Sequence, residues 1–323
     1  MSDYSKLYAV ICEILTQIKT VPFLVDVGAS KEAPPVWQPL APYSYYLGFD
    51  PDSRETTDEQ IEGFKEAKIY KSAVGKKDEN NAKLYLTEFP FCSSLLKPNE
   101  DALKDYMFAP FFLVNSVETT QTESLGTVCD KLNIPCVHWL KSDSQGADLQ
   151  VFKGLDKERR NHVLALDLEP GLIDAYCGED KFTQVHEYLC KKGFWLSDCT
   201  VHGSYRVKTS TMARLKKDAD VDADAFYNHI KRAPGWVELR YLRSLESMVE
   251  NEASMEDYCL LWVFAAIDGH VGFCMDVYYY LEKQAVDKVL LEIMKDYGIS
   301  CLCPQPELQS PLRRLLKKLK LLI

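Results

Sequence analysis

The sequence predicts an α/β fold built on a doubly wound, mostly parallel sheet, followed by a helical C-terminal extension. Short continuous apolar runs alternate with helical patterns through the first two thirds of the chain, which is typical of strands covered by helices on both faces. Two of the runs end in an acid and a turn, and the apolar spacing after residue 208 becomes helical. The predicted strands are residues 23–28, 46–51, 69–74, 137–143, 163–168 and 194–196.

These patterns divide the chain into three parts. Residues 1–20 form an N-terminal helix, residues 21–207 the α/β domain and residues 208–323 the helical extension. Alternating residues predict a flap, residues 82–122, between the third and fourth strands. The most apolar region, residues 258–281, contains acids and a histidine, so we expect buried helix there. The N-terminal helix has one apolar face, formed by Leu7, Val10, Ile11, Ile14, Leu15 and Ile18.

The composition argues against a nucleic-acid partner and for a cytoplasmic protein. The 38 Lys and Arg and 48 Asp and Glu residues give a formal net charge of −10, which repels phosphate backbones. Eleven cysteines are scattered through the chain, and its first residues lack the pattern of a cleaved signal segment. We therefore expect reduced thiols and a cytoplasmic location.

Residues 310–323 form a basic amphipathic pattern typical of a helix. Ser310 would cap this helix, and Pro311 would lie in its first turn. The pattern fits peripheral contact with an anionic membrane. It fits equally a helix whose leucines pack on the protein or on a second copy in a homodimer. We favour packing and keep membrane association as the alternative. The leucine face is Leu312, Leu315, Leu316, Leu319, Leu322 and Ile323.

Small and acidic residues follow the first two predicted strands, where ligands bind in a doubly wound sheet. The first strand ends at Asp26 and continues into Gly28, Ala29 and Ser30. A glycine there lets the backbone approach a ligand closely. Asp50 ends the second strand, and a carboxylate at that place can accept both hydroxyls of a ribose. The pair predicts a nucleoside-containing cofactor, although a tight turn with a capping aspartate would look the same.

The first loop favours S-adenosylmethionine over a dinucleotide. Residues 28–33 contain one glycine, whereas a dinucleotide site needs the GxGxxG pattern. A pyrophosphate would also meet Glu32. S-adenosylmethionine carries no phosphate, and its cationic sulfonium tolerates acids such as Asp26. The sequence contains no GxxxxGK[ST] loop, which argues against nucleoside triphosphate hydrolysis.

The fourth predicted strand leads into the most specific motif, LKSDSQGADLQVFKGL at residues 140–155. This string resembles the signature of the FkbM-type methyltransferases. Four further stretches agree in order, and together the resemblance covers roughly residues 20–205. Two positions differ from the family pattern: the second glycine of the first loop is missing, and Ser142 replaces an aliphatic residue. The further stretches are residues 25–29, 49–52, 72–75 and 168–170, the last followed by Tyr176.

The resemblance implies a class I methyltransferase (Rossmann-like) fold that binds S-adenosylmethionine. It also implies O-methylation, often of sugars in glycans or of natural products, so we expect a sugar, glycan or small-molecule hydroxyl as acceptor. The positions that match the family motifs are the expected cofactor contacts. They are Asp26, Gly28, Ala29, Ser30, Asp50, Ser72, Ala73 and Asp143.

Four residues are candidates for the chemistry of methyl transfer. A hydroxyl is a poor nucleophile while protonated, and Asp143, at the end of the central strand, is the first candidate for its general base. Lys141 would orient the acceptor or stabilise developing charge, or would instead pair with a buried acid. Gln145 and Glu169 are candidate acceptor contacts, and His202 is a second candidate base. We expect no metal, although a divalent ion at Asp143 and Glu169 stays open.

Two other functions stay open. A degenerate methyltransferase fold could serve as a non-catalytic interaction module, and a nicotinamide-dependent oxidoreductase would share the fold. The three acids at strand ends argue against the first, and the missing GxGxxG argues against the second. The acceptor pocket would be built from residues 82–122 and the region after residue 208. Trp236, Trp262 and residues 278–280 could stack on a sugar ring, although such aromatic residues are more often core.

Overall fold

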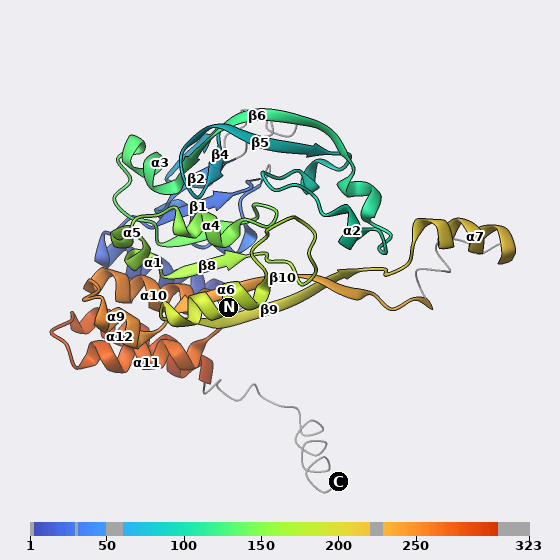
Figure 1. The fold of residues 1–323 in the computed structure, drawn as a ribbon. Coiled ribbons are helices and arrows are strands. Elements are labelled where there is room, and N and C mark those ends of the chain that lie inside the picture. The colour runs from blue at the N-terminus through green and yellow to red at the C-terminus, as the bar shows by residue number, and fades with distance from the viewer. Residues whose placement is uncertain (1–2, 30–31, 50–60, 220–228, 303–323) are drawn as a thin grey trace, which may run out of the picture.

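A seven-stranded sheet forms the centre of the molecule (Figure 1). The computed structural model describes residues 3–29, 32–49, 61–219 and 229–302. The strands of the sheet are β1 (Phe23–Val27), β2 (Tyr45–Phe49), β3 (Glu66–Tyr70), β7 (Trp139–Ser142), β8 (Ala165–Leu168), β9 (Phe194–Ser204) and β10 (Ala233–Arg243). Their order is β3-β2-β1-β7-β8-β10-β9. The first five are parallel, and β10 runs antiparallel to both of its neighbours.

Alternate residues of the central strands enter two separate cores. Leu24 belongs to one core and Val25 to the other, because successive side chains of a strand point to opposite faces. The first core holds α1 (Asp3–Ile18) and α10 (Met255–Ile267), on which α11 (Val271–Glu282) and α12 (Lys288–Leu302) pack. The second holds α3 (Leu125–Leu132), α4 (Asp148–Lys153) and α6 (Phe182–Lys191). Helices on both faces confirm the predicted doubly wound α/β fold.

The helices of the first core match the sequence expectations. In α1 the predicted apolar face packs on this core: Ile11, Ile14 and Leu15 are buried, and Leu7, Val10 and Ile18 are partly buried. The apolar region expected to be buried helix forms α10 and α11, which meet at a short connection around Asp268. Within the described ranges, we find no helix whose length and apolar character would let it cross a membrane.

A small second sheet includes two strands that overlap the segment predicted as a flap. Its strands are β4 (Ala73–Gly75), β5 (Glu79–Thr87) and β6 (Val114–Ser124), in the order β4-β6-β5. β5 and β6 pair antiparallel, and Figure 1 shows them above the main sheet. The third predicted strand, residues 69–74, is divided between β3 and β4 and therefore joins the two sheets. Three short helices lie between β5 and β6: η3 (Pro90–Cys92), α2 (Glu100–Leu103) and η4 (Ala109–Phe112).

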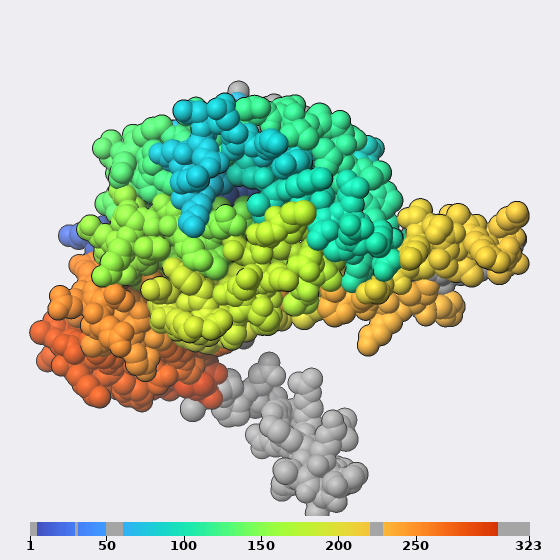
Figure 2. Space-filling view, viewed as in Figure 1, coloured from blue at the N-terminus to red at the C-terminus, as the bar shows by residue number. Residues whose placement is uncertain are grey.

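The expectation that the chain after residue 208 is helical is wrong for β10. This strand lies inside the main sheet, between β8 and β9. Buried Val237, Leu239 and Tyr241 alternate in it with the more exposed Glu238 and Arg240, which is the pattern of a strand. α7 (Thr209–Ala219) projects from the body beyond the ends of β9 and β10 (Figure 2). The other helices are η1 (Pro35–Trp37), η2 (Ala41–Tyr43), α5 (Lys157–His162) and α9 (Leu245–Glu250).

Candidate active site

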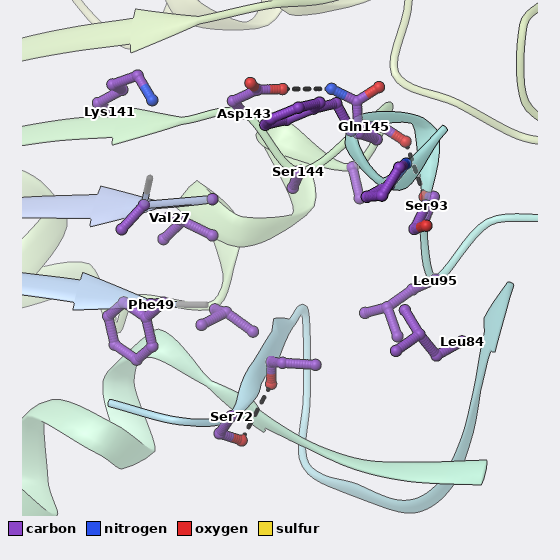
Figure 3. Close-up of a pocket in the computed structure, with 18 of the residues that line it drawn as sticks. Val27, Phe49, Ser72, Leu84, Ser93, Leu95, Lys141, Asp143, Ser144 and Gln145 are labelled. Carbon is purple, nitrogen blue, oxygen red and sulfur yellow. Dashed lines mark hydrogen bonds between the residues drawn. The ribbon is translucent and has the colours of Figure 1, made fainter. Parts of the chain in front are cut away.

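A cavity of about 590 Å³ opens at the carboxyl ends of β1, β2 and β7 (Figure 3). Val27 and Phe49 line it from the main sheet, and Leu84 of β5 lies on the opposite side. Its volume is in the range of small-molecule sites. Strand order reverses between β1 and β7, which is where an open α/β sheet binds ligands. The cavity is therefore the first candidate for a cofactor site.

Gly28 brings the first loop against the loop that follows β7. Its φ angle of +81° is one that other residues rarely adopt. A Cβ atom at this position would lie 2.3 Å from the backbone oxygen of Asp143, so only glycine fits without displacement. The backbone N–H groups of Gly28 and Ala29 both donate to the carbonyl of Phe49, at 3.0 and 2.9 Å. The predicted contacts Gly28 and Ala29 therefore line the cavity at a rigid, close-packed turn.

Asp143 lies at the cavity edge, where β7 ends. The side-chain amide of Gln145 donates to its carboxylate at 2.5 Å (Figure 3). Gln145 has a φ of 54° and precedes Gly146, whose φ is 99°, so the chain turns sharply here. Burial raises the pKa of Asp143 to about 6, and Lys141 opposes this shift. At neutral pH the carboxyl group is therefore mostly ionised but close to its protonation range.

Asp148 holds the loop that carries Asp143. Its buried carboxylate accepts hydrogen bonds from the Ser142 hydroxyl, at 2.8 Å, and from the Ser144 backbone and hydroxyl, at 2.8 and 2.7 Å. The backbone N–H of Glu169 also donates to it, at 3.2 Å. Ser142, which departs from the family pattern, thus has a buried partner. The ends of β7 and β8 are fixed to one carboxylate.

Lys141 and Asp26 form an ion pair, the alternative that the sequence left open for Lys141. The ammonium nitrogen lies 3.1 Å from Asp26 Oδ1, and the Tyr46 hydroxyl donates to Oδ2 at 3.0 Å. The Asp26 side chain is 1% exposed. Asp26 is not among the described residues that line the cavity, whereas Lys141 borders it. Contact between Asp26 and a cofactor stays a prediction.

Glu169 follows β8 and borders two further cavities. One, of about 210 Å³, is shared with Lys141. The other, of about 430 Å³, is shared with Gln145, which also lines the 590 Å³ cavity. Burial, followed by the nearby charge of Asp143, raises the pKa of Glu169 to about 9, so this carboxyl keeps its proton at neutral pH. The four residues predicted for chemistry therefore meet where the three cavities adjoin.

The remaining predicted contacts divide between the cavity and the undescribed ranges. Ser72 and Ala73 line the cavity from the junction of the two sheets, and the Ser72 hydroxyl donates to the Ala73 carbonyl at 3.3 Å. Ser30 and Asp50 lie outside the described residues, as do residues 310–323. His202 is paired with Glu238 at 3.0 Å and stacks on Trp236. In the described ranges, no three His, Cys, Asp or Glu side chains gather as metal ligands, and the expectation about metal stays a prediction.

The flap contributes lining residues that sequence reasoning did not single out. Phe91 borders both the 590 and the 430 Å³ cavities. The Tyr176 hydroxyl lies 2.9 Å from both the Gln145 side-chain oxygen and the Cys92 carbonyl, and so ties the flap to the β7 loop. A signal was present in the sequence: Phe89 and Phe91 lie close together in the segment predicted as a flap.

Comparison with known proteins places this site in a family. Residues 27–196 match the family model described as the methyltransferase FkbM domain. The matched segment begins in β1, contains the flap and the whole β7 loop, and ends in β9. No curated protein matches the chain. Because the family model spans more than half of the 323 residues, the chain belongs to the FkbM methyltransferase family.

Proposed function

We propose that the protein transfers a methyl group from S-adenosylmethionine to a hydroxyl oxygen of a small-molecule or glycan acceptor. The observation that carries the proposal is the position of Asp143, an ionisable carboxyl that lines a cofactor-sized cavity and is hydrogen-bonded to Gln145, which borders both this cavity and a second one. Membership of a methyltransferase family supports the reaction class. The acceptor atom is inferred from the acid–base groups at this boundary.

The lining of the 590 Å³ cavity fits S-adenosylmethionine. Gly28 lets the first loop pack directly against the Asp143 backbone in the cavity wall, because a Cβ atom there would lie 2.3 Å from the backbone oxygen of Asp143. Glu32 and Asp143 both line the cavity and suit a cationic ligand better than a pyrophosphate. Phe49 and Leu84 offer apolar surface for a purine ring. Asp50, which follows Phe49 in the sequence, is the expected ribose ligand.

The carboxyl groups of Asp143 and Glu169 have different protonation states at neutral pH. When bound, S-adenosylmethionine supplies an electrophilic methyl group, which the acceptor oxygen takes as the carbon–sulfur bond breaks. Asp143, with a pKa of about 6, is ionised and can accept the hydroxyl proton. Glu169, with a pKa of about 9, is protonated and can donate a hydrogen bond to the acceptor. Gln145 fixes the orientation of the Asp143 carboxylate.

Calorimetric titration with S-adenosylmethionine, with NAD as the control ligand, tests the cofactor. We expect saturable binding of S-adenosylmethionine alone, and a loss of affinity of about tenfold in Asp50→Ala, because one ribose-binding carboxylate is removed. Asp101→Ala, an exposed change on α2, is the matched control. Absence of binding at millimolar ligand would contradict the proposal and favour a non-catalytic interaction module.

A further inference from the structure

We propose that the 430 Å³ cavity binds the methyl acceptor and selects an uncharged hydroxyl compound with a flat apolar ring, such as a phenol or aryl alcohol. The inference rests on the proposed function and narrows its acceptor class. We call this space the aromatic cavity. It is lined by Phe89, Phe91, Cys92, Phe108, Phe111, Phe112, Gln145, Gly146, Glu169, Gly171, Ile173, Ala175, Tyr176, Glu179, Gly203, Ser204, Gly235 and Trp236.

The position of the aromatic cavity suits an acceptor. It shares Gln145 and Phe91 with the cofactor-sized cavity, so a ligand in it adjoins that space. Gln145 donates to Asp143, which places the candidate base at the same boundary. Glu169 borders the aromatic cavity from β8. A hydroxyl at this boundary would lie near the carboxyl groups of Asp143 and Glu169.

The walls of the aromatic cavity are built from rings. Phe112 lies between Phe108 and Tyr176, with ring centroids 5.2 and 5.5 Å apart. A second group, Phe89 with Phe91 and Phe111, has centroid separations of 5.2 Å. Rings at these separations pack edge-on or offset against a flat apolar ligand.

Part of this aromatic surface is open to solvent. The side chains of Phe91 and Phe111 are 57% and 50% exposed, and Trp236 is 36% exposed. Phe91 and Phe111 both contact Phe89, and such a group of exposed aromatic side chains at a cavity is typical of a binding surface. Because the cavity is open to solvent there, it can also bind one end of an acceptor that is larger than the cavity. The rest of such an acceptor would stay in solvent.

The charge of the aromatic cavity disfavours an anionic acceptor. Among the described residues that line it, none is Lys, Arg or His, and two are glutamates. Burial raises the pKa of Glu179 to about 7, so this group is partly ionised at neutral pH. A phosphate or carboxylate on the acceptor would lose water without gaining a cation. Phosphorylated sugars and acidic sugars are therefore poor ligands.

Two of the polar side chains that line the aromatic cavity, those of Tyr176 and Glu179, have partners within the protein. The Tyr176 hydroxyl contacts Gln145 and the Cys92 carbonyl, and Glu179 accepts from the Ala175 backbone at 2.6 Å. A sugar with several hydroxyls needs several partners, since a desolvated hydroxyl without one costs free energy. A ring with one hydroxyl needs only the pair of carboxyls at the boundary. The lining therefore favours a phenol or aryl alcohol over a glycan.

Calorimetry with three probes in the presence of S-adenosylhomocysteine tests the inference. The probes are 2-naphthol, 2-naphthoate and methyl β-D-glucopyranoside. We expect 2-naphthol to bind saturably and 2-naphthoate to bind at least about tenfold more weakly. Equal or tighter binding of the glucoside or of 2-naphthoate would overturn the inference.

Single substitutions locate the probe. Phe111→Ala and Trp236→Ala should each weaken 2-naphthol binding about tenfold, because each removes ring contact at a half-exposed position that tolerates truncation. Tyr279→Ala, an equally exposed aromatic on α11 outside the aromatic cavity, should leave binding unchanged. Unchanged binding in both cavity variants would overturn the inference. If S-adenosylmethionine still binds in that case, the proposed function stands and only the acceptor class fails.

Discussion

The Lys141 ammonium lies 3.1 Å from the Asp26 carboxylate, across the pairing of β7 and β1. The lysine side chain is 23% exposed and the aspartate 1%. Without the lysine cation, Asp26 would keep the Tyr46 hydroxyl as its hydrogen-bond partner among the side chains that the structure describes. The pair therefore makes Lys141 a stabilising residue as well as a cavity residue.

Lys141→Met should lower the free energy of unfolding by about 3 kcal/mol, since it leaves a buried charge uncompensated. Urea denaturation measures the change. The double variant Lys141→Met with Asp26→Asn should lose less stability than the two single variants summed. Lys191→Met, which breaks an exposed pair with Glu187, should cost under about 0.5 kcal/mol. Equal costs for Lys141→Met and Lys191→Met would contradict the prediction.

Asp143→Asn should lower turnover by about 100-fold or more while changing cofactor affinity only about threefold, because the amide cannot accept the acceptor proton. With the wild-type protein, turnover should rise as the pH increases through about 6, where Asp143 loses its proton. The variant should lack this rise. Steady-state kinetics between pH 5 and 8, together with titration of the cofactor, separate the two effects. A parallel loss of turnover and affinity would assign Asp143 to binding instead.

Glu169→Gln should change how stability depends on pH. The pKa of Glu169 is raised in the folded state to about 9, so the folded protein holds a proton that the unfolded chain releases near pH 4.5. Because the folded state binds more protons than the unfolded state, the contribution of Glu169 to the free energy of unfolding falls as the pH rises from about 5 to 9. The glutamine variant should lose less stability over that range. Chemical denaturation at pH 5, 7 and 9 tests this, and identical slopes would contradict it.

Asp148→Ala should destabilise the fold by about 3 kcal/mol or more, because four donors lose their acceptor in a buried position. Turnover of the folded fraction should also fall, since the loop bearing Asp143 loses its anchor. Asp156→Ala removes an exposed helix cap on α5 and should cost about 1 kcal/mol with turnover unchanged. Thermal denaturation and steady-state kinetics of both variants separate the loss of stability from the loss of turnover.

Gly28→Ala and Gly269→Ala form a matched pair. Their φ angles are +81° and +79°, so both substitutions incur a similar backbone cost, about 1 to 2 kcal/mol. Only the Cβ at residue 28 would meet another atom, the backbone oxygen of Asp143. Gly28→Ala should therefore weaken S-adenosylmethionine binding as well as stability, whereas Gly269→Ala should affect stability alone. Normal affinity in Gly28→Ala would show that the first loop does not shape the cofactor site.

The parallel core of the fold could be predicted because its strands are buried on both faces. β1, β7 and β8 are short, mostly apolar runs, each with one charged residue, and such runs indicate strands without knowledge of their neighbours. β10 was missed although Val237, Leu239 and Tyr241 alternate with Glu238 and Arg240 as in a strand, because the helical pattern of the chain that follows was extended over it. The burial of β10 depends on its pairing with β8 and β9, which cannot be predicted from local composition.

The candidate site could be predicted in part. Gly28 and Asp143 follow predicted strands, and strand ends converge at one edge of a parallel sheet. The orientation of Asp26 was not available from the sequence, because alternation tells which residues share a face but leaves open which face borders the cavity. Phe91 and Phe111 lie in short helices and turns of the flap, where long-range packing decides the backbone path.

The Lys141–Asp26 pair belongs to a row of alternating charges that fixes the alignment of five strands. Asp26, Lys141, Asp167, Arg240 and Asp198 occupy directly paired positions across β1, β7, β8, β10 and β9. Arg240 lies 2.6 Å from Asp167, and Lys141 3.1 Å from Asp26. A slip of one residue in any of these strands would turn its charge toward the opposite, apolar core. The row thus penalises mispaired sheets during folding, so the residues beside the cavity also help to specify which strand alignment the chain reaches.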